Sequence, residues 1–233
     1  MHNKINKYLI CICVLVIFSN RDIISQSLMG YAGLVRIPTA TNIKDKKLSI
    51  GAYFIDKSIA VIGETNNLRN IIALNFLPFL EVDVVLNNLI NSNSPEQAIG
   101  DRQTSFKIVL QENNYLPNVG LGFYDLIGAL DKGGIHSDFY YFVLTKDFEI
   151  NKLIFSTNVG YAGYVYHKNN SGLNGIFYGL SATLFNSIEL MGEYDSRYYN
   201  IGTRLILFNH LSFLFSLIDM KHFSGGASFS FQL

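Results

Sequence analysis

The stretch SIELMGEYD at residues 187–195 decides the fold class, because its side chains alternate between two kinds. Successive side chains of an extended chain point to opposite sides, so alternate positions share a face. One face carries Ile188, Leu190, Gly192 and Tyr194, and the other carries Glu189, Met191, Glu193 and Asp195. A helical period fits the stretch less well, and we therefore predict a β-strand with one apolar face.

The same two-residue alternation returns along the rest of the chain. At the C-terminus, one face carries Ala227, Phe229, Phe231 and Leu233, and the other carries Gly226, Ser228, Ser230 and Gln232. The pattern predicts twelve strands, an even number as in closed antiparallel barrels. Their expected ranges are 47–55, 70–77, 79–87, 104–111, 118–125, 138–147, 153–161, 174–184, 187–195, 199–208, 210–218 and 225–233. Residues 30–37 and 58–64 are further candidate strands, which give an alternative count of fourteen.

The connections between these expected strands fall on two sides of different character. One side has short connections at residues 77–78, 112–117, 148–152, 185–186 and 209, and the other has connections at 88–103, 126–137, 162–173 and 195–198. Outer-membrane barrels show this asymmetry, with short periplasmic turns and longer outer loops. We therefore predict an all-β fold, namely a single transmembrane antiparallel up-and-down β-barrel.

A soluble β-sandwich would show the same alternation, with its polar face turned to water. Only 15% of the chain is charged, against about 25% in an average protein. The expected polar faces are rich in Gly and Ser, which suits a lumen better than a soluble exterior. Aromatic residues also fall near strand ends, where the aromatic girdles of a barrel lie. These are Tyr161, Tyr164, Tyr166, Tyr194, Tyr198, Tyr199, Phe208 and Phe223.

The first 27 residues have the pattern of a secretory signal peptide. Lys4 and Lys7 precede an apolar run at residues 9–18, and residues 25–27 offer a small-x-small cleavage pattern. The run is too short for a membrane-spanning helix, which needs about 20 residues. The expected division is a signal peptide at 1–27, a periplasmic or lumen segment at 28–46 and an outer-membrane β-barrel at 47–233.

Charged side chains recur on the expected inward face of the barrel. They are Glu81, Asp83, Lys107, Asp125, Glu189, Glu193, Asp195 and Arg204. These groups either line a water-filled lumen or pair with one another and fill it, because charges away from bulk water need partners. If Asp195 pairs with Asn200 across the hairpin, Arg204 faces Met191 and lies diagonal to two glutamates.

Large aromatic side chains also fall on this inward face, at Tyr53, Tyr124, Phe177 and Phe185. A barrel of twelve strands is intermediate between filled eight-stranded barrels and open sixteen-stranded porins. The inward aromatics favour the narrower case, and we expect a largely obstructed lumen.

Two clusters carry residue types found in hydrolases. One is the expected last outer loop with Asp219, Lys221, His222 and Ser224, and the other is His136, Ser137 and Asp138. A histidine oriented by a carboxylate activates a serine hydroxyl in barrel lipases, but loops are rich in the same residues for turn formation. We expect no enzyme activity, no cofactor and no metal site. Cys11 and Cys13 both lie in the expected signal peptide, so a mature chain would carry no cysteine.

Four stretches resemble the YjbH family of bacterial outer-membrane proteins, which is linked to exopolysaccharide and capsule production. They are GYAGLVRIPTA at 30–40, SFKIVLQENNYLPNVGLGFYDLIG at 105–128, EYD at 193–195 and DMKHFSGGASFSF at 219–231. The second and fourth are the most specific, because they combine order, spacing and unusual residue choices. The resemblance implies a Gram-negative outer-membrane barrel that assists polysaccharide production or export.

The expected partners follow from this reading. They are outer-membrane lipid, exopolysaccharide and envelope secretion proteins. Nucleic acid is not expected, because basic and acidic residues are equal at 18 each and no basic block occurs. Two alternatives stay open at this point: a structural or passive pore barrel without a polysaccharide role, and an outer-leaflet lipid-modifying enzyme.

Overall fold

The computed structural model describes residues 26–41, 46–60, 65–90, 102–110, 115–126, 138–166 and 172–233. Among these residues, no helix is long and apolar enough to cross a membrane. The expected signal peptide, except for its last two residues, lies outside the described part of the chain.

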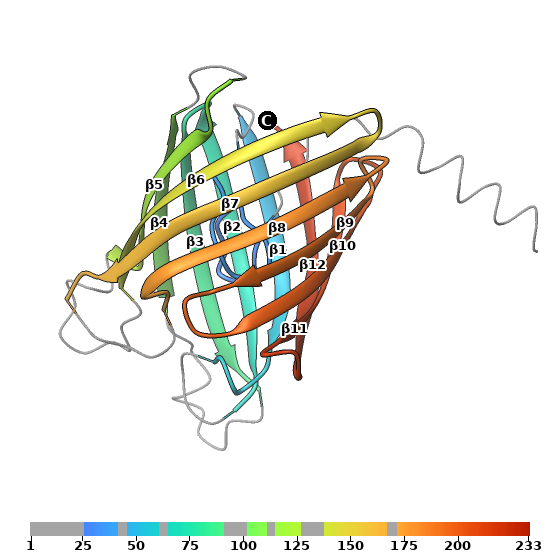
Figure 1. The fold of residues 1–233 in the computed structure, drawn as a ribbon. Coiled ribbons are helices and arrows are strands. Elements are labelled where there is room, and N and C mark those ends of the chain that lie inside the picture. Colours follow the sequence, from blue (N-terminus) through green and yellow to red (C-terminus); the bar gives the residue numbers. More distant parts are fainter. Residues whose placement is uncertain are drawn as a thin grey trace, which may run out of the picture.

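Twelve antiparallel strands close into a barrel, in which each strand pairs with its neighbours in sequence and β1 closes on β12 (Figure 1). The strands are β1 (Lys47–Ile55), β2 (Asn67–Leu77), β3 (Leu80–Leu89), β4 (Arg102–Leu110), β5 (Asn118–Tyr124), β6 (Phe139–Ile150), β7 (Leu153–Tyr164), β8 (Gly175–Leu184), β9 (Ile188–Tyr194), β10 (Tyr199–Leu207), β11 (Leu211–Ile218) and β12 (His222–Gln232). The all-β fold and the count of twelve are confirmed.

The alternative count of fourteen is wrong. Residues 30–37 form no strand and lie inside the barrel, and residues 58 and 59 belong to a turn. Residues 61–64, the rest of the second extra candidate, lie outside the described residues. A barrel that is already closed by the β1–β12 pairing has no free edge at which another strand could add.

The two ends of the barrel differ in their connections. One end, here called the turn end, holds the short β2–β3, β6–β7, β8–β9 and β10–β11 connections and the C-terminus (Figure 1). The opposite loop end holds the β1–β2, β3–β4, β5–β6 and β7–β8 connections, and also two tight turns after β9 and β11. The connection after β11 spans only residues 219–221, so His222 and Ser224 belong to β12 rather than to an outer loop.

Two-residue turns at the turn end use backbone conformations that match the twist of the strands. Phe185 and Asn186 have φ values of 52° and 54°, and Phe208 and Asn209 have 55° and 61°. Paired positive φ values characterise the type I′ turn, which joins twisted antiparallel strands. The turn leaves Phe185 51% exposed, so the expectation that this ring points inward is wrong.

Gly225 and Gly226 lie within β12 rather than in a turn before it. A Cβ on Gly226 would lie 2.1 Å from the carbonyl oxygen of Ala52, and one on Gly225 would lie 2.3 Å from that of Leu214. Both neighbours are backbone atoms of adjacent strands and cannot give way. Glycine is therefore required here for close strand approach, not for turn formation.

Alternate side chains of the strands face the outside and the lumen. On β9, Leu190 is 49% exposed, while Glu189 and Glu193 are buried. On β12, Phe229 is 50% exposed and Ser228 is buried. The two-residue alternation therefore separates an apolar outer face from a polar inner wall, as a barrel in lipid requires.

Candidate functional site: the lumen and its plug

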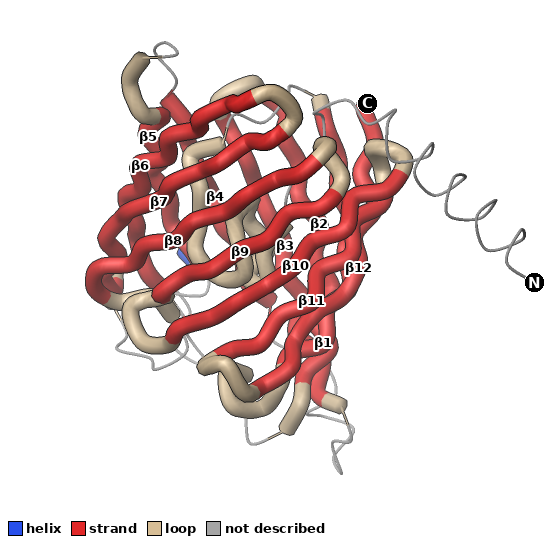
Figure 2. Tube along the Cα trace, turned by 45° about the vertical axis from the view of Figure 1, so that its right-hand side comes forward, coloured by secondary structure: helices blue, strands red, loops and turns tan. Residues whose placement is uncertain are grey.

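The lumen is filled by the chain's own N-terminal segment. Residues 26–40, here called the plug, are all buried, and they form the irregular trace inside the strand wall in Figure 2. The plug has no regular secondary structure and contains two isolated bridges, Gln26 to Ala32 and Gly33 to Pro38. Its described part begins at Gln26, two residues before the segment boundary expected from the sequence.

Apolar plug side chains make a core with the wall. Tyr31 is fully buried, and its ring centroid lies 6.0 Å from that of Tyr124 and 5.5 Å from that of Tyr141. Burial raises the pKa of the Tyr31 phenol well above its ordinary value, so the group stays neutral. Its hydroxyl donates to the carbonyl oxygen of Arg36 at 2.7 Å and links the two arms of the plug.

Wall glycines make room for the plug. A Cβ at Gly202 would lie 2.6 Å from Cγ2 of Val35, and one at Gly120 would lie 3.2 Å from the Cβ of Ala40. A Cβ at Gly179 would be equally close to two further plug side chains. The absence of side chains at these wall positions shapes the lumen to fit the plug.

Glu193 of β9 holds the tip of the plug. Its carboxylate oxygens accept hydrogen bonds from three consecutive backbone N–H groups, those of Val35 at 3.0 Å, Arg36 at 2.8 Å and Ile37 at 3.3 Å. A carboxylate that accepts from successive amides makes strong charge-assisted bonds. The tip is thereby fixed in one conformation, although it belongs to no strand or helix.

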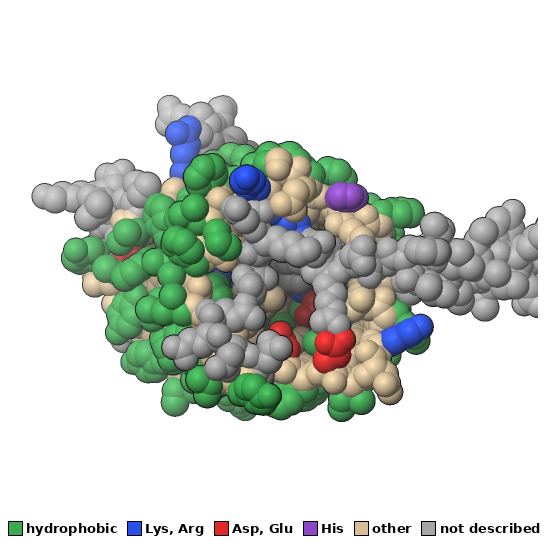
Figure 3. Space-filling model, turned by 90° about the horizontal axis from the view of Figure 1, so that it is seen from above, with side chains coloured by type: hydrophobic (Ala, Val, Ile, Leu, Met, Phe, Trp, Pro, Cys, Tyr) green, Lys and Arg blue, Asp and Glu red, His purple; other side chains and the backbone are tan. Residues whose placement is uncertain are grey.

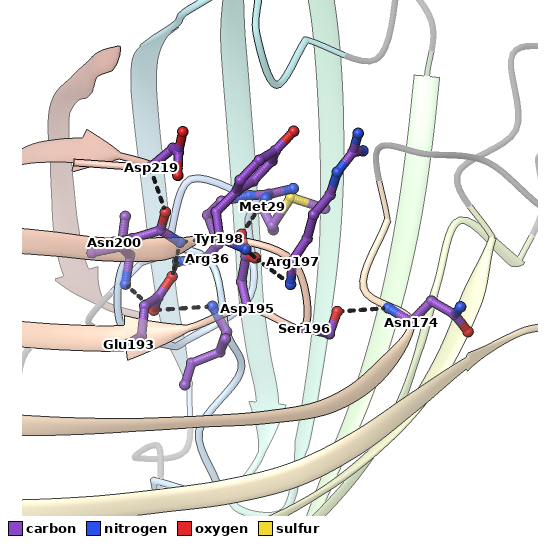
Figure 4. Close-up of polar contacts among 12 residues, drawn as sticks. Met29, Arg36, Asn174, Glu193, Asp195, Ser196, Arg197, Tyr198, Asn200 and Asp219 are labelled. Atoms are coloured by element: carbon purple, nitrogen blue, oxygen red, sulfur yellow. Dashed lines mark hydrogen bonds and ion pairs between the residues drawn. The ribbon is translucent and has the colours of Figure 1, made fainter. Parts of the chain in front are cut away.

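Arg36, the only charged side chain of the plug, forms an ion pair with Asp195 at the end of β9. Asn200 of β10 donates from its side-chain amide to Glu193 at 2.9 Å and to Asp195 at 3.1 Å. Figure 4 shows these groups together, with Asn200 also accepting from the backbone N–H of Asp219 at 3.1 Å. The plug tip is therefore tied to the wall close to the loop end.

Arg204 of β10 holds the plug by its carbonyl groups. Its guanidinium donates to the backbone oxygens of Gln26 at 3.3 Å, Gly33 at 3.0 Å and Leu34 at 3.0 Å. It also forms an ion pair with Glu189 of β9. This arginine is fully buried and joins both arms of the plug to the wall.

The expected register around Arg204 is wrong by two residues. Tyr199 pairs with Tyr194, which brings Arg204 directly opposite Glu189 rather than Met191. The difference arises in the turn, where the carboxylate of Asp195 accepts from two backbone N–H groups, those of Arg197 and Tyr198. An aspartate that caps a turn in this way belongs to the turn and not to the ladder.

A second group of charges holds the plug from the opposite wall. Lys107 of β4 forms an ion pair with Glu81 of β3 at 2.5 Å. Glu81 accepts from the backbone N–H of Ala32 at 2.6 Å, and Lys107 donates to the carbonyl oxygen of the same residue at 3.1 Å. One residue of the plug is therefore held through both its backbone groups.

The remaining two inward candidates are Asp83 on β3 and Asp125 directly after β5. Asp83 accepts from the Ser105 hydroxyl at 2.8 Å within the wall. Asp125 follows β5 with a φ of 55° and is buried. All eight inward charges expected from the sequence are therefore buried, and at least five of them contact the plug.

Several residues of the site were missed from the sequence. Arg69 of β2 donates to the carbonyl oxygen of Leu28 at 2.7 Å and to Asn87 at 2.7 Å. Thr145 of β6 accepts from the backbone N–H of Ala40 at 2.7 Å. The alternation begins three residues before the expected start of β2, and that earlier start would have placed Arg69 inward.

The candidates at the loop end take separate partners. Asp219 pairs with Lys221 at 3.0 Å, whereas His222 lies 3.4 Å from Asp56. Ser224 is buried, and its hydroxyl accepts from the backbone N–H of Asp56 at 3.0 Å.

In the second cluster, Asp138 accepts from the backbone N–H of Tyr166 at 2.6 Å. His136 and Ser137 lie outside the described residues. Among the residues that the structure describes, no group of three or more acidic, histidine or cysteine side chains is placed to hold a metal ion.

Viewed from the turn end, hydrophobic side chains form the outer ring of the molecule, and charged side chains also lie in its hollow centre (Figure 3). This closed barrel, with an apolar outer face and a polar inner wall, has a fold that fits an outer-membrane protein. The chain matches the model of the YjbH family, described as exopolysaccharide biosynthesis protein YbjH, over residues 25–205. The chain belongs to this family, and three of the four resembling stretches lie within the matched residues. No curated protein matches it.

Proposed function

We propose that this protein is an outer-membrane β-barrel that assists the production or export of exopolysaccharide or capsule. The observation that carries the proposal is the closed barrel with its apolar outer face in a chain of the exopolysaccharide biosynthesis family. The outer face displays aliphatic side chains such as Ile50, Val159 and Leu180, each about half exposed, which lipid would cover.

The proposed role is non-catalytic and needs no cofactor. The partners that fit it are outer-membrane lipid, the exopolysaccharide and envelope secretion proteins. Replacing His222 by alanine tests the lipid-enzyme alternative: unchanged lipid composition of the envelope is the expected result, and a lost lipid modification would support the enzyme instead.

Two measurements test the proposal itself. The protein should fractionate with the outer membrane and migrate faster on gels before heating than after it, as folded barrels do. Deleting the gene should lower the amount of cell-surface polysaccharide, and the intact gene should restore it. Unchanged surface polysaccharide in the deletion strain would refute the polysaccharide role.

A further inference from the structure

The wall charges that hold the plug also have partners on the wall itself. A buried charge that loses its only partner strongly destabilises a protein, whereas a solvated ion pair changes the free energy of unfolding only slightly. If water replaced the plug, these wall groups would remain paired rather than become isolated. The wall pairs are Arg204 with Glu189, Lys107 with Glu81, and Asn200 with Glu193.

The plug contributes nothing to the closure of the barrel. All twelve strands pair only with one another, and the plug's two bridges are both internal. Its bonds to the wall run between plug backbone and wall side chains, as at Glu193 and Arg204, or between side chains, as at Arg36. Moving the plug would therefore break no strand pairing.

Some buried polar atoms of the inner wall make no hydrogen bond to the plug or to the wall among the described residues. Both side-chain polar atoms of Asn75 and the hydroxyl of Tyr141 are buried and have no hydrogen-bond partner among the described residues. Buried polar groups normally have partners, so such groups indicate a wall that meets water or a polar ligand. Amide and phenol groups are suited to the hydroxyl groups of a saccharide, since they both donate and accept hydrogen bonds.

The plug is a loop with its base and tip at different depths. At its base, Ala40 binds Thr145, which pairs with Asn118, the first residue of β5 near the turn end. At its tip, Arg36 binds Asp195 immediately after β9, at the loop end. The plug also leads into β1, which starts at the turn end. Once its bonds to the wall are broken, the tip can move along the lumen toward the turn end, where the plug leads into β1.

We propose that the plug is a displaceable gate, whose tip at residues 33–37 retracts toward the turn end and uncovers a polar path for a hydroxyl-rich polysaccharide. The identity of the polymer rests on the proposed function, whereas the movement does not. The apolar core around Tyr31 keeps the closed state dominant without ligand. The polymer opens the gate by binding the uncovered wall, because a ligand shifts an equilibrium only through its preference for one state.

A reversible disulfide across the tip tests this movement. Val35→Cys with Gly202→Cys joins the tip to β10, because a Cβ at position 202 lies 2.6 Å from Cγ2 of Val35. The matched control, Ala40→Cys with Gly120→Cys, joins only the base, where the corresponding Cβ atoms lie 3.2 Å apart. Both pairs are placed in a chain whose natural cysteines, at positions 11 and 13, are replaced by alanine.

The first readout is cell-surface polysaccharide, measured with and without dithiothreitol. The oxidised tip lock (Val35→Cys with Gly202→Cys) should lower cell-surface polysaccharide to the level of the gene deletion. Reduction of its disulfide should restore the wild-type level. The base lock (Ala40→Cys with Gly120→Cys) should leave cell-surface polysaccharide unchanged in both conditions. Wild-type polysaccharide levels with a fully oxidised tip lock would refute the proposed function, and the conductance readout then decides whether the gate exists.

The second readout is potassium chloride conductance of the purified protein in a planar bilayer. Glu193→Gln weakens the charged bonds to the tip and should raise the open time by about tenfold or more. Adding the oxidised tip lock to Glu193→Gln should abolish these openings. Folded Glu193→Gln protein that never opens overturns the gate. Openings that the lock abolishes, without any effect on polysaccharide, support the gate and refute the proposed function.

Discussion

The outer and inner faces of the same strands follow different rules. On β9, Leu190 projects outward and is 49% exposed, whereas its neighbour Glu189 is 7% exposed and bound to Arg204. In the proposed membrane location, the outer face meets a uniform apolar solvent, so any apolar side chain of moderate size serves there. The inner face meets one particular partner, so each residue must match the plug in charge and shape. We therefore expect many substitutions to be tolerated on the outer face of the barrel and few on its inner face.

The largest expected effect comes from an inner charge. Arg204→Ala removes the ion-pair partner of Glu189 and leaves plug carbonyl groups without a donor. We expect a loss of about 3–5 kcal/mol in the free energy of unfolding, measured by urea titration of the protein in bilayers. Replacing Glu189 by alanine as well should recover part of the loss, because it removes the uncompensated charge. An unchanged unfolding midpoint for Arg204→Ala would mean that the lumen is wet and wide.

The next effect is on the outer face. Leu190→Arg places a charge among lipid chains and should cost about 2–4 kcal/mol if the site is near the bilayer midplane. The conservative replacement Leu190→Val should change the free energy of unfolding much less. Equal stability of the two variants in bilayers would contradict the assignment of this face to lipid.

A smaller effect should follow from overpacking the inner wall. A Cβ at Gly179 would lie 2.7 Å from Leu34 and 2.8 Å from Ile37, so Gly179→Val should destabilise by about 1–3 kcal/mol. Gly192, on the outer face of the next strand, has no atom within 4 Å of a Cβ and is the matched control. If Gly192→Val lowers the unfolding midpoint as much as Gly179→Val, packing against the plug is not the cause.

The smallest effect is expected at the loop end, outside both faces. The side chains of Lys221 and Asp219 are 70% and 41% exposed, and exposed pairs contribute about 0–1 kcal/mol. Lys221→Ala should therefore leave the unfolding midpoint nearly unchanged at physiological salt. A large shift would show that this turn takes part in holding the barrel closed.

Strand positions were the part of the fold most open to prediction. The alternation around Leu190 and Phe229 placed these side chains outward, and the structure agrees. The pairing register between strands was harder to predict. Asp195 was expected to pair with Asn200 in the ladder, but it caps the turn, and the pairing of Arg204 is shifted as a result. Hydrophobic alternation cannot detect this shift, because a change of two residues in the register leaves every side chain on the same face.

The contents of the lumen could also be predicted only in part from the sequence. The inward charges were visible from their period, and an obstructed lumen was expected because Tyr53, Tyr124 and Phe177 point inward. The main obstruction is instead the plug, whose residues 30–37 were a candidate strand but form no strand in the structure. Its conformation is held by side chains that are distant in sequence, such as Glu193. Such contacts cannot be inferred from the residues of the plug alone.

The amino-acid sequence by itself determined that this chain forms a β-barrel with an apolar exterior, because a period of two residues is a property of each strand alone. It also determined, for the same reason, that the eight predicted charges face the lumen, although it missed Arg69. Only the tertiary structure decided what those charges bind. Arg204 and Glu193 meet the plug because closure of twelve strands brings β9 and β10 around residues separated from them by more than 150 positions in the chain. Such contacts depend on the geometry of the whole barrel, whereas periodicity depends only on neighbouring residues.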